Sequence, residues 1–222
     1  LWRCLPKFRQ VFERETPFLP KPAVKDYLLF IDIESSGLPL QWDLPYSAPG
    51  NWPHTVQVGW MVFTPNGQEV KRQSHYIQPL DFEVSPASME IHPLTPAFLL
   101  AHGQPRQQVL HLLQQDLQQY TPLVIGHFME FDYHVLSADF YREGVENPLA
   151  LLPTFCTMLA SSDLMRLPRK KYLKLGELYS YLFHQSLENQ HDAVVDATAT
   201  AQCFFELQKR RIITPEKMAK QN

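Results

Sequence analysis

The feature that most constrains the fold is a short apolar run that carries two carboxylates at its end. The run reads Tyr27-Leu-Leu-Phe-Ile-Asp-Ile33, and Glu34 follows it. Its length and its aromatic and β-branched residues are typical of a buried strand. Because side chains alternate along a strand, Asp32 and Glu34 lie on the same face. Two buried carboxylates raise each other's pKa unless a cation neutralises them, so the pair indicates metal binding. The alternative is a strand that ends at Asp32 and leaves both carboxylates in solvent.

The rest of the apolar pattern predicts an α/β fold with a mixed central sheet. Strands are expected over 27–33, 55–63, 69–78 and 123–125. Helices are expected over 95–103, 105–120, 132–143, 175–183 and 192–210. The turn Pro65-Asn66-Gly67 joins the second and third strands as a hairpin. Strands come first and helices then alternate with one or two more strands, which favours a mixed sheet flanked by helices over an all-parallel doubly wound sheet.

Size and composition agree with one such domain. The 222 residues are 45% hydrophobic and 19% charged, as in ordinary globular proteins, and no segment approaches the ~20 apolar residues of a membrane span. The net charge of −3 argues against a broad basic face for duplex nucleic acid. A proline-rich and aromatic opening gives way to apolar sequence, which predicts an N-terminal extension or interdomain segment over 1–25, a domain over 26–212 and a tail over 213–222.

Three cysteines bear on the cellular compartment. Cys4, Cys156 and Cys203 are widely spaced, odd in number and without a CxxC pair, which argues against a disulfide framework or a zinc knuckle. The opening segment also lacks the apolar core of a signal peptide. We therefore expect a protein of the cytoplasm with no membrane partner. The first residue is Leu1, so the sequence leaves open whether the chain is a fragment of a larger protein.

Two further segments place acidic residues at the starts of helices. Asp132 follows a short strand and enters a helix, where the helix dipole favours a carboxylate for structural reasons alone. His191 and Asp196 open the last long helix. Asp192 would share a face with Asp196, but it is better placed as the cap of that helix. Taken singly, Asp132 and His191 have ordinary structural explanations.

Together these segments resemble the three exonuclease motifs of the DEDDh, or DnaQ-like, nucleases. The motifs are Asp32-Ile-Glu34-Ser-Ser-Gly37, Gly126-His127 leading to Phe131-Asp132, and His191 with Asp196. The family includes the epsilon-type proofreading exonucleases of bacterial DNA polymerase III, RNase T and oligoribonuclease. His191 stands where the sister DEDDy group has a Tyr. The resemblance covers 27–209 and implies the RNase H-like exonuclease fold.

The resemblance also implies a metal-dependent mechanism. Asp32, Glu34, Asp132 and Asp196 would hold two divalent ions, Mg²⁺ or Mn²⁺, which oxygen ligands without cysteine suit. Ions about 4 Å apart would stabilise the attacking and leaving oxygens of an in-line displacement by water. His191 would act as the general base, since its ordinary pKa is about 6.5. The product would be a nucleoside 5′-monophosphate.

A second set of residues is expected to contact substrate on the same grounds. Ser35-Ser36 replaces a commoner Thr pair, and Phe128 stands where relatives often have Asn, so we expect the terminal nucleotide to be held differently here. His92 lies in a segment where relatives often have Ile-His-Gly, although Pro93 replaces the Gly. The expected substrate-binding residues are Ser35, Ser36, Gly37, His92, His127, Phe128 and Phe131.

Two other groups could contact a nucleic-acid strand. The loop 37–54 carries Trp42, Tyr46 and Trp52, whose rings stack on unpaired bases or else pack the loop onto the domain. A basic cluster could follow a phosphate backbone or form an ordinary solvated loop. Its members are Arg166, Arg169, Lys170, Lys171 and Lys174.

The expected function is a 3′–5′ exonuclease acting at 3′ ends of single-stranded DNA, in proofreading or repair. An RNA-directed or oligonucleotide-degrading relative would use the same residues. A catalytically silent nucleic-acid or partner-binding module would have lost an acid or the His, and none is replaced here. The expected partners are a nucleic acid with a free 3′ end and a polymerase or other protein, for which 1–25 is a candidate docking segment. DNA or RNA preference, processivity, pathway and oligomeric state stay open.

Overall fold

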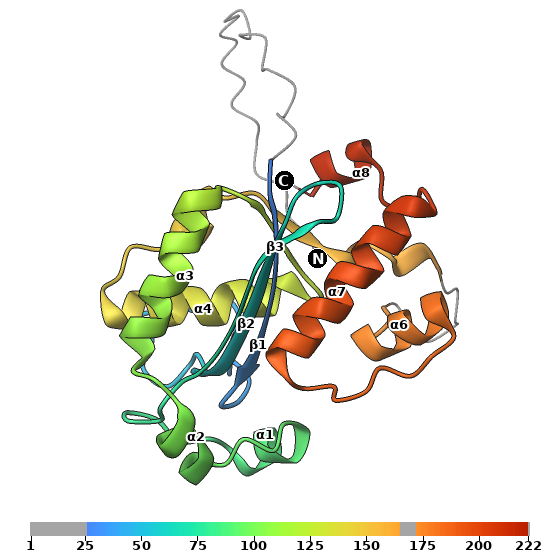
Figure 1. Ribbon diagram of the computed structural model, residues 1–222. Coiled ribbons are helices and arrows are strands. Elements are labelled where there is room, and N and C mark those ends of the chain that lie inside the picture. Colours follow the sequence, from blue (N-terminus) through green and yellow to red (C-terminus); the bar gives the residue numbers. More distant parts are fainter. Residues whose placement is uncertain (1–25, 165–171, 222) are drawn as a thin grey trace, which may run out of the picture.

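The computed structural model describes residues 26–164 and 172–221, in which a five-stranded sheet lies between two groups of helices (Figure 1). The strand order is β3-β2-β1-β4-β5. The strands are β1 (Leu28–Ser35), β2 (Thr55–Phe63), β3 (Glu69–Tyr76), β4 (Leu123–Gly126) and β5 (Thr154–Cys156). β1 pairs antiparallel with β2 and β2 with β3, whereas β4 is parallel to β1 and β5 is parallel to β4. The predicted mixed sheet is confirmed.

The helices fall on both faces of this sheet. Figure 1 shows α3 and α4 on one side, and α6 and α7 on the other. The helices are α1 (Pro86–Ile91), α2 (Pro96–His102), α3 (Arg106–Tyr120), α4 (Met129–Glu143), α5 (Thr157–Ala160), α6 (Leu175–Phe183), α7 (Ala193–Lys209) and α8 (Pro215–Ala219), with short 3₁₀ helices η1 (Pro148–Leu151) and η2 (Ser162–Leu164). α4 begins three residues earlier than expected. β5, α1, α5 and α8 were not located from the sequence, because elements of three to six residues depend on tertiary contacts rather than on a periodic pattern.

β1 supplies both halves of the hydrophobic core. Leu29 and Ile31 belong to the buried cluster on the α3 and α4 side, and Leu28 and Phe30 to the cluster on the α7 side. Since side chains alternate, Asp32 and the following Glu34 continue the face that α7 covers. The two carboxylates therefore point toward the start of α7.

α7 lies unusually close to β2. A Cβ atom on Gly59 would be 2.5 Å from the backbone nitrogen of Val194. Ala193, Ala197 and Ala201 are buried along the same helix, as the small residues of this segment predicted. The close approach brings the first turn of α7 directly over the carboxylates of β1.

Gly59→Ala is expected to lower the free energy of unfolding by about 1–3 kcal/mol, because the added methyl group overlaps backbone atoms that cannot move independently. Urea denaturation would measure the change. Gly37→Ala is the matched control, since a Cβ on Gly37 meets nothing within 4 Å. Equal stability of the two variants would contradict the close packing of α7 on β2.

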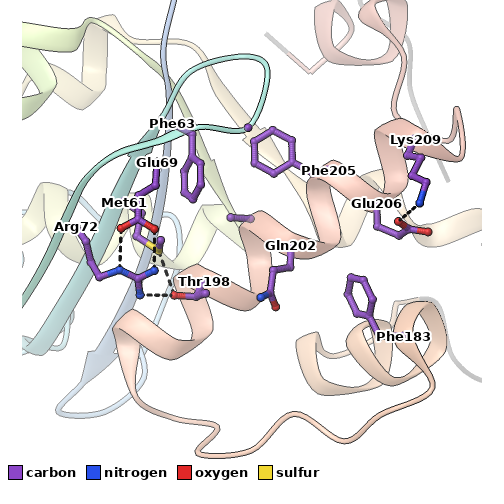
Figure 2. Close-up of a pocket in the computed structure, with 12 residues that line it drawn as sticks. Met61, Phe63, Glu69, Arg72, Phe183, Thr198, Gln202, Phe205, Glu206 and Lys209 are labelled. Carbon is purple, nitrogen blue, oxygen red and sulfur yellow. Dashed lines mark hydrogen bonds and ion pairs between the residues drawn. The ribbon is translucent and has the colours of Figure 1, made fainter.

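A hollow between the β2–β3 hairpin and α7 lies apart from these carboxylates (Figure 2). Arg72 donates hydrogen bonds to both carboxylate oxygens of Glu69 and one to the hydroxyl of Thr198. Lys209 pairs with Glu206 at 3.7 Å. The apolar side chains that line the hollow include Met61, Phe63, Phe183 and Phe205. Because its charged side chains pair with one another, the hollow lacks the convergent polar groups of a catalytic site.

The end of the chain packs against the sheet. Ile213 is buried, and the side-chain oxygen of Gln221 accepts a hydrogen bond from the backbone N–H of Cys156 in β5 (2.8 Å). The segment 213–222, expected as a tail, thus contains α8 and covers the edge strand as far as Gln221. The extension 1–25 lies outside the described residues, as do Arg166, Arg169, Lys170 and Lys171 of the basic cluster. Among the described helices, none has the length and apolar character to cross a membrane.

Candidate active site

The acidic site lies where β1 extends beyond its parallel neighbour β4. Backbone pairing between them covers only Leu28–Phe30 of β1. Further along, the N–H of Ile33 donates to Oδ1 of Asp132 instead (3.1 Å). A side chain from α4 thus replaces the missing strand, and this bond holds the Asp132 carboxylate beside Asp32.

The turn before α4 makes this approach possible. A Cβ atom on Gly126 would be 2.9 Å from Sδ of Met129 and 3.2 Å from Oδ2 of Asp132, so a larger residue would displace the carboxylate. Phe128 then adopts a left-handed backbone conformation with φ of 72°. Asp132 lies in the first turn of α4, where the helix dipole stabilises its negative charge.

The start of α7 supplies the other half of the site. Asp192 caps the helix by accepting from the N–H groups of Val194 and Val195, as predicted for it. The backbone N–H of His191 donates to Oδ2 of Asp196 (3.2 Å). Single ligand atoms of Glu34, His191 and Asp196 lie within 4.8 Å of one another. The structure therefore brings together residues that are more than 150 positions apart in sequence.

Gln57 is a positioning residue that the sequence did not reveal. It is buried on β2 opposite Glu34, and its side-chain oxygen accepts from the N–H of Ala193 at the start of α7 (3.2 Å). This bond ties the helix carrying Asp196 to the sheet carrying Glu34. The available signal was a lone amide within the apolar stretch Thr55-Val-Gln-Val-Gly59.

Burial and mutual repulsion favour protonation of the four acids. Burial raises the pKa of Glu34 to about 8, and the charges of Asp196 and Asp192 contribute. Burial raises the pKa of Asp196 to about 6. The pKa of Asp32 lies well above its ordinary value, mainly because of burial and secondly because of the charge of Asp132. Burial also raises the pKa of Asp132, although the hydrogen bond from the N–H of Ile33 acts to lower it. These carboxylates thus need a proton or a cation near neutral pH.

The donor set fits a divalent cation. Oδ1 of Asp196 is buried and has no hydrogen-bond partner within the described part of the chain. An acceptor left in this state is costly unless something else satisfies it. Carboxylate oxygens are the ligands that hard divalent cations prefer. The orphaned oxygen and the raised pKa values therefore agree with metal binding at this site.

His191 differs from the acids in its exposure to solvent. Its backbone is left-handed, with φ of 69°, and its side chain lies at the exposed rim of the site. Partial burial lowers the pKa of its imidazole, and the nearby charge of Lys174 lowers it further. A neutral ring at pH 7 has a free lone pair, so it can accept a proton.

The expected substrate contacts divide into buried and exposed side chains. Ser36 is buried and accepts from the N–H of His54 (2.9 Å), while Ser35 donates to the carbonyl of Gly37 (2.8 Å). His92 is 2% exposed, and its Nε2 donates to the carbonyl of Ser35 (2.9 Å). These side chains hold the backbone that follows Glu34.

His127 is also enclosed, whereas Phe128 is exposed. Nε2 of His127 donates to the carbonyl of Leu173 (3.0 Å), and Nδ1 lies 3.0 Å from the hydroxyl of Thr157. Burial lowers the pKa of His127 to about 4, so its ring is neutral at pH 7. Phe128 is 38% exposed, and Phe131 is stacked behind it at 6.1 Å between ring centroids. Of this set, Phe128 therefore offers the largest free surface to a ligand.

The sequence matches the RNase T exonuclease family model over residues 29–204. The chain belongs to this exonuclease family. The predicted enzyme class is thereby confirmed, and the match covers all four acids and His191. The sequence matches no curated protein.

Solved structures with the same fold agree with the family. E. coli exonuclease I in complex with a dA16 oligonucleotide matches with a TM-score of 0.70 and 18% identity, over 88% of this chain and 42% of that one. A zinc-bound complex of the E. coli enzyme with single-stranded DNA has the same values. An exonuclease I structure interpreted in terms of processivity matches with a TM-score of 0.70 and 17% identity, over 88% of this chain and 43% of that one. The RNase H-like exonuclease fold is confirmed, and this chain spans less than half the length of those proteins.

Proposed function

We propose that this protein is a metal-dependent 3′–5′ exonuclease that shortens single-stranded DNA from its 3′ end and releases nucleoside 5′-monophosphates. The observation that carries the proposal is the convergence of Asp32, Glu34, Asp132 and Asp196 at one site, with His191 at its rim. Similar structures include exonuclease I bound to single-stranded oligonucleotides. An epsilon-like proofreading or repair role, with a polymerase or other protein as partner, is the biological setting we propose.

The four acids would hold two divalent ions, Mg²⁺ or Mn²⁺, which would supply positive charge to the scissile phosphate and make water a better nucleophile. Asp32 lies in the electrostatic field of all three other acids, so it is the central ligand candidate. The bond from Ile33 orients Asp132, and the bond from His191 orients Asp196. His191 would take the proton from the attacking water, since its ring is exposed and one of its nitrogens lies within 4.8 Å of carboxylate oxygens of Glu34 and Asp196.

A nuclease panel tests the proposal. The substrates are 5′-labelled DNA and RNA strands with either a free or a phosphate-blocked 3′ end, each with Mg²⁺ or with EDTA. We expect stepwise shortening of free-ended DNA, little action on blocked strands, and none with EDTA. Faster shortening of RNA would favour an RNA-directed or oligonucleotide-degrading enzyme. Binding without hydrolysis of any strand would support the catalytically silent module instead.

His191→Ala is expected to lower kcat by about 10²–10⁴-fold while leaving Mn²⁺ affinity nearly unchanged, because the side chain moves a proton rather than holding the ion. Hydrolysis kinetics and isothermal titration measure the two quantities. The matched control is His111→Ala, at an exposed position of α3 away from the acids. Loss of Mn²⁺ affinity in His191→Ala would show that His191 is a ligand, as its distance to Glu34 and Asp196 also permits.

We also propose a cytoplasmic location. Cys156 and Cys203 are free, buried thiols, and burial raises the pKa of the Cys203 thiol to about 12. Unpaired thiols suit a reducing compartment. Fractionation of cells that produce the tagged protein would test this location.

A further inference from the structure

Two exposed aromatic rings lie beside the acidic site. Trp42, from the loop after β1, is 42% exposed, and Phe128, at the start of α4, is 38% exposed. Their ring centroids are 6.0 Å apart. Phe128 is the residue before α4 and Asp132 lies in the first turn of that helix, so this pair of rings lies at the same end of α4 as the acid.

We propose that these rings begin an aromatic platform that stacks the unpaired bases of a single strand next to the cleaved bond. We define the platform as Trp42, Tyr46, Phe128, His134 and Tyr141. This inference rests on the proposed function and names the substrate feature that the same site recognises, a strand of several unpaired nucleotides.

The platform packs against a buried ring, Trp52, and a half-buried one, Phe131. Trp42 packs edge-on against Trp52 at 6.0 Å and 87°, and Trp52 is only 2% exposed. Trp52 stacks in turn on His134 at 5.2 Å and 18°. Phe128 lies nearly parallel to Phe131, at 14°. Trp52 therefore packs the loop, while Trp42, which also contacts Phe131 and His134, keeps 42% of its surface exposed to a ligand.

Hydrogen bonds hold the loop that carries Trp42. Gln41 and Asn51 bond to each other twice across its base, each at 2.9 Å. Arg142 of α4 donates to the carbonyls of Trp52 and Pro53 and is itself bound by the buried Asp139 (2.6 Å). These hydrogen bonds fix the loop, and the fixed loop holds Trp42 in its exposed position. A ring held in place loses little conformational entropy when a base stacks on it.

The aromatic surface continues along α4, away from the acids. A shallow pocket lined by Trp42, Tyr46, His134 and Tyr141 follows, with the Tyr46 hydroxyl 2.8 Å from Nδ1 of His134. From Phe128 to Tyr141 the helix rises about 20 Å at 1.5 Å per residue. At about 3.4 Å per stacked base, that length accommodates at most about six nucleotides.

The chemistry of the surface selects unpaired bases as its occupant. Exposed charged residues that line the pockets beside the rings are the acids Asp43 and Glu130, which repel a phosphate backbone, and the base Lys220, which attracts one. With two acids against one base these charges give no net attraction, so binding must come mainly from the ring faces, and each stacked base contributes about 1–3 kcal/mol. In a duplex the bases already stack on one another, so their faces are not available. Continuity with the acidic site places the 3′ end at Phe128.

Binding measured in EDTA, where no hydrolysis occurs, tests the platform separately from catalysis. The probes are 5′-labelled oligothymidylates of two to eight nucleotides, read by fluorescence anisotropy. The wild-type affinity should rise with length up to about six nucleotides and respond weakly to salt, because few phosphates are neutralised. Trp42→Ala should weaken binding of the six-nucleotide strand by at least about 5-fold and that of the dinucleotide much less.

Three comparisons keep the test decisive. Tyr181→Ala removes a similarly exposed ring on α6, outside the platform, and should bind as wild type does. Trp42→Phe should restore most of the affinity that Trp42→Ala loses, and equal melting temperatures would exclude misfolding. If Trp42→Ala keeps the wild-type affinity at every length, the platform is refuted, whether or not the protein is a nuclease. If the length dependence appears but no strand is hydrolysed, the platform stands and the proposed function fails.

Discussion

Asp32→Asn is expected to slow hydrolysis by at least about 10³-fold and to abolish high-affinity binding of Mn²⁺. Asp32 is the acid whose carboxylate interacts with those of Asp132, Asp196 and Glu34 together. Asn keeps the shape of the side chain but not the charge that binds a cation. Single-turnover hydrolysis and isothermal titration measure the two losses.

The same variant has a second expected property that separates lost chemistry from lost structure. The metal-free protein should become more stable, because Asp32→Asn removes a carboxylate whose charge is disfavoured by burial and by its neighbours. Asp163→Asn, at a largely exposed acid, is the control and should change neither activity nor metal binding. Undiminished hydrolysis by Asp32→Asn would overturn the assignment of the active site.

Divalent ions are expected to stabilise the protein far more at about pH 8.5 than at about pH 5.5. The folded-state pKa of Glu34 is raised from 4.5 to about 8. Below about pH 4.5 the group is protonated in both states. Between the two pKa values the folded state keeps a proton that the unfolded state has lost, so stability falls as pH rises. One pKa unit corresponds to about 1.4 kcal/mol, so Glu34 lowers stability by as much as roughly 4 kcal/mol by pH 8.

A bound cation removes this penalty, so its effect on the melting temperature should grow with pH. Asp196, with a pKa raised to about 6, adds to the effect at lower pH. Thermal melts with Mg²⁺ and with EDTA at each pH provide the comparison. His54 and His127, whose pKa values are lowered to about 4, change stability with pH in the opposite direction. Because they do so with and without metal, their contribution cancels in the difference between the two melting temperatures. Glu34→Gln should lose most of the pH dependence. A metal effect independent of pH would contradict a cation bound by Glu34 and Asp196.

Secondary structure and candidate site residues could be predicted from the sequence wherever a pattern was long or chemically unusual. The apolar run of β1, the hairpin turn at Pro65-Asn66-Gly67 and the long helices α3 and α7 agree with their predicted positions to within a few residues. The acids of β1 stood out because carboxylates are costly in a buried strand. Asp132 and His191 needed the family resemblance, since their local surroundings also suit ordinary helix starts.

Short elements and indirect roles could not be predicted in the same way. β5 has three residues and exists because β4 offers it a partner. The sequence did not reveal Gln57, and it predicted His92 as a substrate contact, which stays a prediction. Both side chains are buried and bond to backbone near Glu34. Hydrogen bonds of this kind join residues tens to more than a hundred positions apart, and no local periodicity records them.

The strand β1, which carries Asp32 and Glu34, separates what the sequence determines from what the tertiary structure decides. Alternation along the strand determined that both carboxylates share a face, because that follows from backbone geometry alone. Only the tertiary structure decided that α4 and α7 bring Asp132, His191 and Asp196 to that face, through the close approaches at Gly126 and Gly59. It also decided that Trp52 is buried and Trp42 exposed, although the two are alike in sequence context. Exposure depends on which neighbours pack against a side chain, and those neighbours come from distant parts of the chain.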